Sequence, residues 1–131
     1  MTNEDKELLL RDLCGRLPYG VKINNEIQGN FVIYGVCENC IFAGTLTEYG
    51  WANHIDFHIE NIKPYLFPLS SMTEEQKEIY CNLQDKVIYN SKGVTSEDLS
   101  ALTKWLDENM FDWRGLIPKG LAIDATSKNI Y

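Results

Sequence analysis

Nothing in the sequence has the pattern of a membrane span or a secretion signal. No apolar run approaches the roughly 18 residues that a transmembrane helix needs. The first residues, Met1 to Glu7, are acidic rather than basic, and no apolar segment of the signal-peptide type follows them. The sequence therefore predicts a cytoplasmic protein that has no membrane partner.

Basic runs are also missing. The 12 lysines and arginines occur singly along the chain, and 19 acidic residues outnumber them, which gives a net charge of −7. A domain that binds nucleic acid through its phosphates usually carries a basic stripe. The charge pattern argues against DNA or RNA. It leaves another protein, or a second copy of the chain in a homodimer, as the expected partner.

The chain does contain enough apolar residues for one core. Hydrophobic residues make up 44% of its 131 residues, and this length is close to the commonest size of a single domain. No repeat or linker divides the chain, so residues 1–131 are expected to form one domain. The four cysteines are expected to be free thiols in a reducing compartment. We expect two of them, Cys14 and Cys81, in the core.

Three segments have the apolar spacing of amphipathic helices. A threonine precedes each segment at the position where an N-cap side chain would accept a backbone hydrogen bond. The expected helices cover residues 3–16, 74–87 and 96–109, with Thr2, Thr73 and Thr95 as their caps.

Between the first two helices the apolar period changes to that of strands. Residues 54–60 alternate polar and apolar side chains without a break, which is typical of a half-buried strand. Two prolines in residues 64–68 argue against a central strand there, so that stretch is expected to be a connector. The sequence predicts an α+β fold, in which an antiparallel sheet of four to five strands over about residues 21–60 packs with the three helices.

Two stretches resemble an uncharacterised family of short hypothetical proteins from Bacteroides-type bacteria and their prophages or other mobile elements. They are KPYLFPLSSMTEEQ, residues 63–76, and DWRGLIPKGLAID, residues 112–124. The start of the chain, residues 4–22, is similar to that family too. No activity or cofactor is attached to the family. The resemblance therefore implies a genomic context and assigns no functional residue.

The cysteines and histidines in the middle of the chain match a zinc-site spacing. Cys37 and Cys40 are followed by His54 and His58 in a C-x2-C-x13-H-x3-H pattern. A zinc ion needs its ligands about 2.0–2.3 Å away, whereas residues four apart on a strand lie about 13 Å apart. We therefore expect no metal and no cofactor, although a zinc-stabilised binding module, with zinc on both cysteines and one histidine, stays open as an alternative.

The same alternating segment suggests a second alternative. Its polar positions are His54, Asp56, His58 and Glu60. A histidine beside a carboxylate can perform general acid–base chemistry near neutral pH, so a small enzyme could use this face. The plainer interpretation is a solvated sheet face, because alternating charges are usual there. We expect no catalytic residues. An enzyme would be the better interpretation only if these four polar side chains converged in a pocket.

Large aromatic side chains remain unassigned. A connector with two aromatic residues and a C-terminal segment rich in apolar residues cannot all reach one core centre, and exposed aromatic or arginine side chains often mark partner surfaces. The sequence therefore favours a non-catalytic interaction or accessory protein, encoded by a prophage or mobile element if the resemblance holds. The candidate partner-binding residues are Tyr65, Phe67, Trp113 and Arg114.

Overall fold

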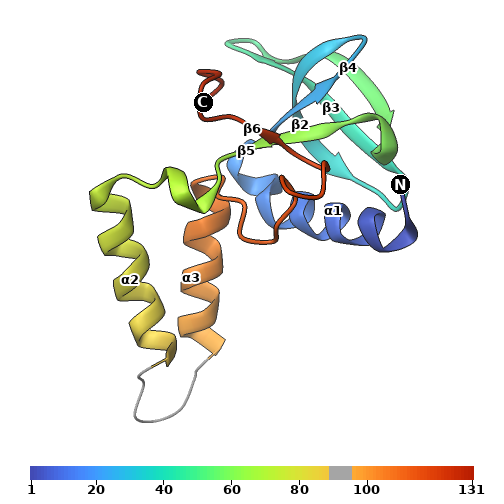
Figure 1. Cartoon of the computed structure of the whole chain (residues 1–131). Helices are drawn as coiled ribbons and strands as arrows, with labels where there is room; N and C mark the ends of the chain where they lie inside the picture. Colours follow the sequence, from blue (N-terminus) through green and yellow to red (C-terminus); the bar gives the residue numbers. More distant parts are fainter. Residues whose placement is uncertain (89–95) are drawn as a thin grey trace.

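The computed structural model describes residues 1–88 and 96–131 and shows an α+β fold (Figure 1). Helix α1 lies along one side of a mixed six-stranded sheet, and helices α2 and α3 project from it side by side. No helix of the described ranges is long and apolar enough to cross a membrane. The helices are α1 (Asn3–Arg16), α2 (Glu74–Ile88) and α3 (Ser96–Glu108), and the strands are β1 (Lys22–Asn25), β2 (Gly29–Val36), β3 (Cys40–Thr47), β4 (Gly50–His58), β5 (Lys63–Leu66) and β6 (Ile123–Asp124), with 3-10 turns η1 (Leu17–Tyr19), η2 (Ile59–Asn61) and η3 (Leu69–Ser71).

Capping side chains set where the first two helices begin, as the sequence predicts. The Thr2 hydroxyl accepts a hydrogen bond from the backbone N–H of Asp5, and the Asp5 carboxylate accepts one from the backbone N–H of Thr2. The same reciprocal pair joins Thr73 and Gln76 ahead of α2. Each pair satisfies two backbone donors that a helix start would otherwise leave unbonded. The expected cap Thr95 lies outside the described residues.

The sheet is larger than expected and is not purely antiparallel. Its strand order is β4-β3-β2-β1-β5-β6, and β5 pairs with β6 in parallel. The expected connector thus contains strand β5, which corrects the sequence-based prediction of four to five strands ending near residue 60. Pro64 is tolerated because the ladder between β1 and β5 covers only two residue pairs, so few backbone donors are needed there.

The first four strands curl around the core. Strand β3 lies between β2 and β4, so flat neighbours would hold their side chains about 9.5 Å apart. The rings of Phe31 on β2 and Phe57 on β4 nevertheless approach to 5.4 Å between centroids. Their convergence places the inner face of the sheet around a closed apolar centre, against which α1 packs Leu9 and Leu13.

Helices α2 and α3 form an arm with little buried surface. Ile79 has the apolar spacing of a core residue, but no residue of α2 is buried and Ile79 is 44% exposed. The main contact along the arm is a stack of Tyr80 on Trp105, with 6.4 Å between ring centroids. Cys81 on α2 and Cys14 on α1 are exposed rather than in the core, because no residue of α2 is buried and α1 turns Leu9 and Leu13 inward.

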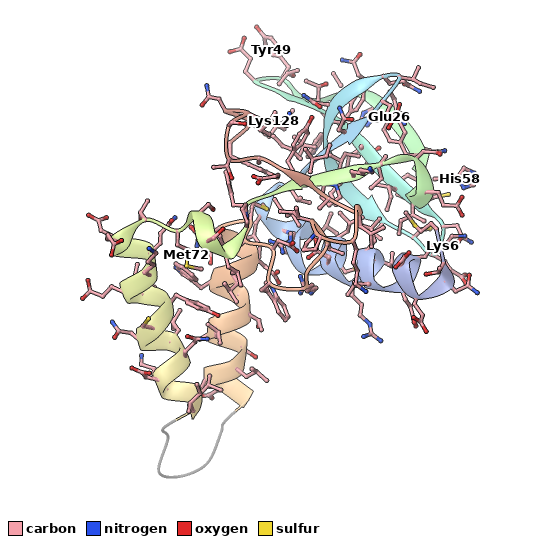
Figure 2. The ribbon with its side chains drawn as sticks, in the orientation of Figure 1. Lys6, Glu26, Tyr49, His58, Met72 and Lys128 are labelled. Atoms are coloured by element: carbon pink, nitrogen blue, oxygen red, sulfur yellow. The ribbon has the colours of Figure 1, made fainter. Side chains whose placement is uncertain are left out.

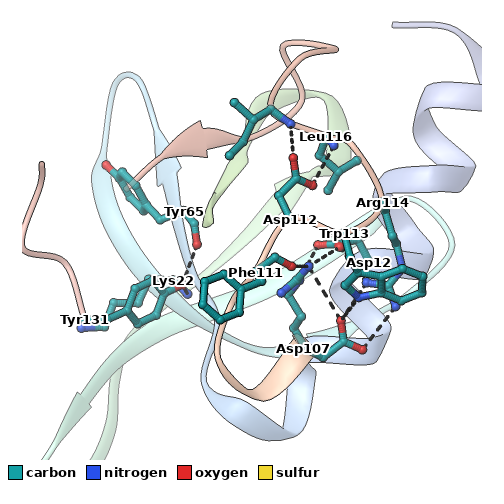
Figure 3. Close-up of polar contacts among 12 residues, drawn as sticks. Asp12, Lys22, Tyr65, Asp107, Phe111, Asp112, Trp113, Arg114, Leu116 and Tyr131 are labelled. Carbon is teal, nitrogen blue, oxygen red and sulfur yellow. Dashed lines mark hydrogen bonds and ion pairs between the residues drawn. The ribbon is translucent and has the colours of Figure 1, made fainter. Parts of the chain in front are cut away.

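The C-terminal segment packs on α1 and the sheet, which we call the body. Leu116 and Leu121 are buried in the main core. The carboxylate of Asp112 accepts hydrogen bonds of 2.8 Å from the backbone N–H groups of Leu116 and Ile117 (Figure 3). This carboxylate fixes the turn that brings the segment back to the sheet, where β6 then pairs with β5.

Candidate functional site

The cysteines and histidines of the zinc-like pattern lie where the strand prediction puts them. Cys37 and Cys40 flank the turn between β2 and β3, with a hydrogen bond of 2.8 Å from the Cys37 N–H to the Cys40 carbonyl. His54 and His58 both lie on strand β4. Across residues 1–88 and 96–131, no group of three His, Cys, Asp or Glu side chains is positioned to hold a metal ion. That purified protein lacks stoichiometric zinc stays a prediction.

The proposed acid–base face is split between two places. Asp56, His58 and Glu60 line a cavity of about 520 Å³ between β4, the β1–β2 turn and η2. His54 lies instead among aromatic rings on the outer face of the sheet. Glu60 belongs to the turn η2 rather than to the strand. The four side chains therefore do not converge on one point.

Glu60 is held by a cation from the helix. Lys6 of α1 forms an ion pair with the Glu60 carboxylate, at the side of the molecule where Figure 2 labels Lys6 and His58. The hydrogen bond and the positive charge of Lys6 lower the pKa of Glu60. A carboxyl with a lowered pKa is ionised at neutral pH, so it is a poor general acid.

Tyr65 and Phe67, two expected partner-binding residues, lie in β5 and directly after it. Tyr65 is buried, its hydroxyl donates to the Asn30 side chain at 2.7 Å, and its carbonyl accepts from the Tyr131 hydroxyl at 3.0 Å. Phe67 lies between the core of the body and the smaller core of the arm, where its ring contacts Phe111. Both side chains contribute to the packing of the domain.

Trp113 and Arg114, the other two expected partner-binding residues, belong to a group of charges between α1 and α3 (Figure 3). The Arg114 guanidinium lies 4.0 Å from the centroid of the Trp113 ring, and the Trp113 N–H donates to Asp107 at 2.9 Å. Arg114 also donates to Asp107 at 2.9 Å and to Asp12 at 2.8 Å. Burial disfavours the charged guanidinium, but these bonds outweigh it and raise the pKa of Arg114.

We call Asp12, Arg16, Asp107 and Arg114 the ion cluster. Arg16 is fully buried and donates two hydrogen bonds of 2.9 Å to Asp12 and one of 2.6 Å to the Phe111 carbonyl. Gly15 makes room for the cluster, because a Cβ at that position would lie 2.7 Å from the Asp107 carboxylate. The cluster joins α1, α3 and the C-terminal segment, so its role is structural.

A group of partly exposed rings lies on the outer face of β2, β3 and β4. Tyr34 is at its centre, with ring centroids 5.1 Å from Trp51 and 5.5 Å from His54. A hydrogen bond of 3.1 Å joins the Tyr34 hydroxyl and His54 Nδ1. Tyr34 is 38% exposed and Trp51 is 39% exposed. With Phe42, which stacks on Tyr34, these residues form what we call the ring cluster: Tyr34, Phe42, Trp51 and His54.

A glycine on β3 lies next to two of these rings. A Cβ at Gly44 would meet the Ala52 carbonyl at 2.9 Å, the Trp51 ring at 3.5 Å and the Tyr34 ring at 3.7 Å. The Ala52 carbonyl is too close for a side chain at Gly44, whereas the two rings would make ordinary van der Waals contact with one. The β3–β4 hairpin also exposes the side chains of Leu46 and of Tyr49, which Figure 2 labels.

The strands that carry the ring cluster have no lysine or arginine. None occurs from residue 23 to residue 62, while five carboxylates do, so this stretch holds five of the seven excess negative charges. Cations are attracted to the faces of aromatic rings and to carboxylates alike. The stretch that carries the ring cluster is therefore acidic, although of its five carboxylates only Asp56 lies on a strand and the others lie in turns or in η2. The five carboxylates are Glu26, Glu38, Glu48, Asp56 and Glu60.

No family model, curated protein or solved structure matches this chain. A functional interpretation therefore depends on the site itself. The resemblance of residues 63–76 and 112–124 to proteins of mobile elements stays a prediction.

The ring cluster was missed by sequence reasoning, which selected aromatic residues in irregular segments instead. Two signals in the sequence point to it. The outward positions of the alternating strands hold Tyr34, Phe42 and His54, and the surrounding stretch contains no basic residue. An apolar ring at an outward position of a half-exposed strand is the informative exception to the usual polar pattern.

Proposed function

We propose that this protein is a non-catalytic protein-binding module whose partner docks on the ring cluster. The observation that carries the proposal is a continuous group of aromatic side chains, centred on Tyr34 and Trp51, that the fold leaves more than a third exposed. Trp and Tyr supply much of the binding energy in protein interfaces because they bury large areas with little loss of conformational freedom. If the resemblance to mobile-element proteins holds, the module is an accessory protein of such an element.

The separation of the acid–base candidates supports binding over catalysis. Catalysis needs a nucleophile or base and its partner within hydrogen-bond reach of one reacting atom. His54 makes its hydrogen bond with Tyr34, and Glu60 is paired with Lys6. The enzymatic alternative retains only Asp56 and His58 around the cavity beside β4.

Two substitutions and a control test the docking face. Trp51→Ala and Tyr34→Ala should each remove most of the partner that the tagged wild-type chain recovers from its native host, as measured by quantitative mass spectrometry. Truncating an interface residue of this kind typically costs about 2 kcal/mol or more, which is roughly 30-fold in affinity. Ile88→Ala removes an exposed apolar side chain from α2 and should leave recovery unchanged.

Each variant must first show a cooperative thermal melt, so that loss of binding is not loss of fold. Unchanged recovery by both aromatic variants would exclude the ring cluster as the docking face.

A further inference from the structure

The free edge of the sheet lies next to the ring cluster. Strand β4, with nine residues, is one of the two outermost strands of the sheet, and it pairs only with β3. Within the described part of the chain, no other segment makes a backbone hydrogen bond to β4. An edge of this kind presents a row of unpaired N–H and C=O groups, to which an extended peptide can add as a further strand.

The edge has little of the protection that most edges carry. Natural edge strands are usually short or hold lysine or proline. β4 contains neither residue, and its one irregularity is a bulge at Asn53, where φ is 54° and the register with β3 shifts. From Ile55 to His58 the strand runs in regular register. That regular half is long enough to pair with an extended segment.

A cavity runs along this same half of the edge. The cavity of about 520 Å³ is lined by Asp56, Phe57 and His58, three consecutive residues of β4. Because successive side chains of a strand point to opposite faces, a space that meets all three lies against the edge and not on one face. The residues at the tip of the β1–β2 turn, 24–28, form the opposite wall.

The charges around the cavity favour a basic occupant. Glu26, Asp56 and Glu60 line it, and Lys63 is the one lysine or arginine in the lining. Glu60 is neutralised by Lys6, whereas Glu26 and Asp56 make no ion pair within the described residues. A second copy of the chain would bring the same carboxylates together, and like charges that face each other across an interface are unfavourable.

Building on the proposed function, we propose that the partner contributes an extended, arginine- or lysine-containing segment that adds as a strand to the edge of β4 in this cavity. Its backbone pairs with residues 55–58, and its basic side chains face Asp56 and Glu26. Beyond the bulge, the same segment passes Trp51 and the rest of the ring cluster, where a guanidinium stacks favourably on an aromatic face.

The test uses the whole chain and a labelled peptide of the same length as β4, in which arginine and valine alternate. Fluorescence anisotropy should show binding at least about tenfold tighter than that of a peptide with glutamate in place of arginine. Asp56→Asn and Glu26→Gln should each weaken binding about threefold or more. Glu78→Gln, which removes an exposed carboxylate from α2, should have no effect.

Methylated peptides test the strand geometry separately from the charge. In an added strand, every second amide N–H points to β4. N-methylation of one alternating set of peptide amides should therefore lower affinity about tenfold or more, and methylation of the other set should leave it unchanged.

Three results would overturn the inference. Equal binding of the arginine and glutamate peptides, or binding of neither, excludes a basic occupant. Equal effects of the two methylated sets exclude strand addition. A chain that forms dimers by light scattering, with the β4 amides protected from hydrogen exchange, assigns the edge to a second copy. In all three cases, loss of the native partner in Trp51→Ala would still support the ring cluster as a docking face.

Discussion

At the scale of single residues, the buried charges of the ion cluster depend most strongly on one another. Arg16 is fully buried, and its Nη1 atom has no hydrogen-bond partner within the described residues. A buried guanidinium is tolerated only while its carboxylate partners are present. Asp12 supplies two of the hydrogen bonds to Arg16 and a third to Arg114. This aspartate is therefore the residue whose loss leaves the most charge uncompensated.

We expect Asp12→Ala to lower the free energy of unfolding by about 3–5 kcal/mol, because it leaves buried positive charge without a partner. Urea denaturation followed by circular dichroism measures the change. The double variant Asp12→Leu with Arg16→Met should lose less stability than Asp12→Ala alone, since it removes both members of the buried pair. A loss below about 1 kcal/mol for Asp12→Ala would contradict the structural role of the cluster.

At the scale of elements, the body and the arm differ in how much surface they bury. Leu106 at the end of α3 is buried in the small core that joins the arm to the body, whereas Ile79 on α2 is largely exposed. Leu106→Ala should therefore cost about 2–5 kcal/mol. Ile79→Ala should cost less than about 1 kcal/mol. Thermal and urea melts of the two variants compare these losses of stability directly. Equal losses would contradict the exposed position of Ile79 on α2.

The elements that the sequence predicted best are those specified by neighbouring residues. The first helix has the predicted bounds, because Thr2 and Asp5 fix its start and Pro18 and Gly20 follow its end. Strands β5 and β6 were missed, because each is short and forms only by pairing with a segment far away in the sequence. Pairing at such a distance leaves no periodic signal in the few residues involved.

The buried surface of each helix was predicted less well than its limits. The apolar spacing of α1 is consistent with the burial of Leu9 and Leu13, but it gives no indication that Asp12 and Arg16 on the same helix are also buried. Their burial depends on Asp107 and Arg114, which come from the other end of the chain. Ile79 has the spacing of a core residue, but it lies on α2, which packs mainly against α3. Its side chain therefore remains exposed.

At the scale of the whole molecule, the candidate site arises from the arrangement of segments that are individually ordinary. The ring cluster needs three adjacent strands to bring Tyr34, Phe42 and Trp51 together. The cavity beside β4 needs the curl of the sheet, which brings the β1–β2 turn near the edge strand. Neither arrangement follows from spacing along the chain. The excess of carboxylates between residues 23 and 62 is visible in the sequence, but its relation to these surfaces is visible only in the structure.

The final prediction concerns the C-terminal segment, which completes the body from a distance. Deleting residues 111–131 removes Leu116 and Leu121 from the main core and Arg114 from the ion cluster. Burial of each such apolar side chain contributes about 1.5–3 kcal/mol, and a whole domain has about 5–15 kcal/mol of net stability. The shortened chain should therefore show no cooperative melt by circular dichroism and should aggregate in light scattering.

Lys128→Ala provides the control for that deletion, because Lys128 is exposed and lies in the deleted stretch (Figure 2). This variant should melt as the wild type does, since surface substitutions usually change stability by no more than about 0.5 kcal/mol. If the shortened chain instead kept a cooperative melt and stayed monodisperse, the sheet would be stable without β6 and the ion cluster. The deleted residues include β6, at the edge of the sheet opposite β4, and loss of the body on deletion should abolish peptide binding at β4 as well.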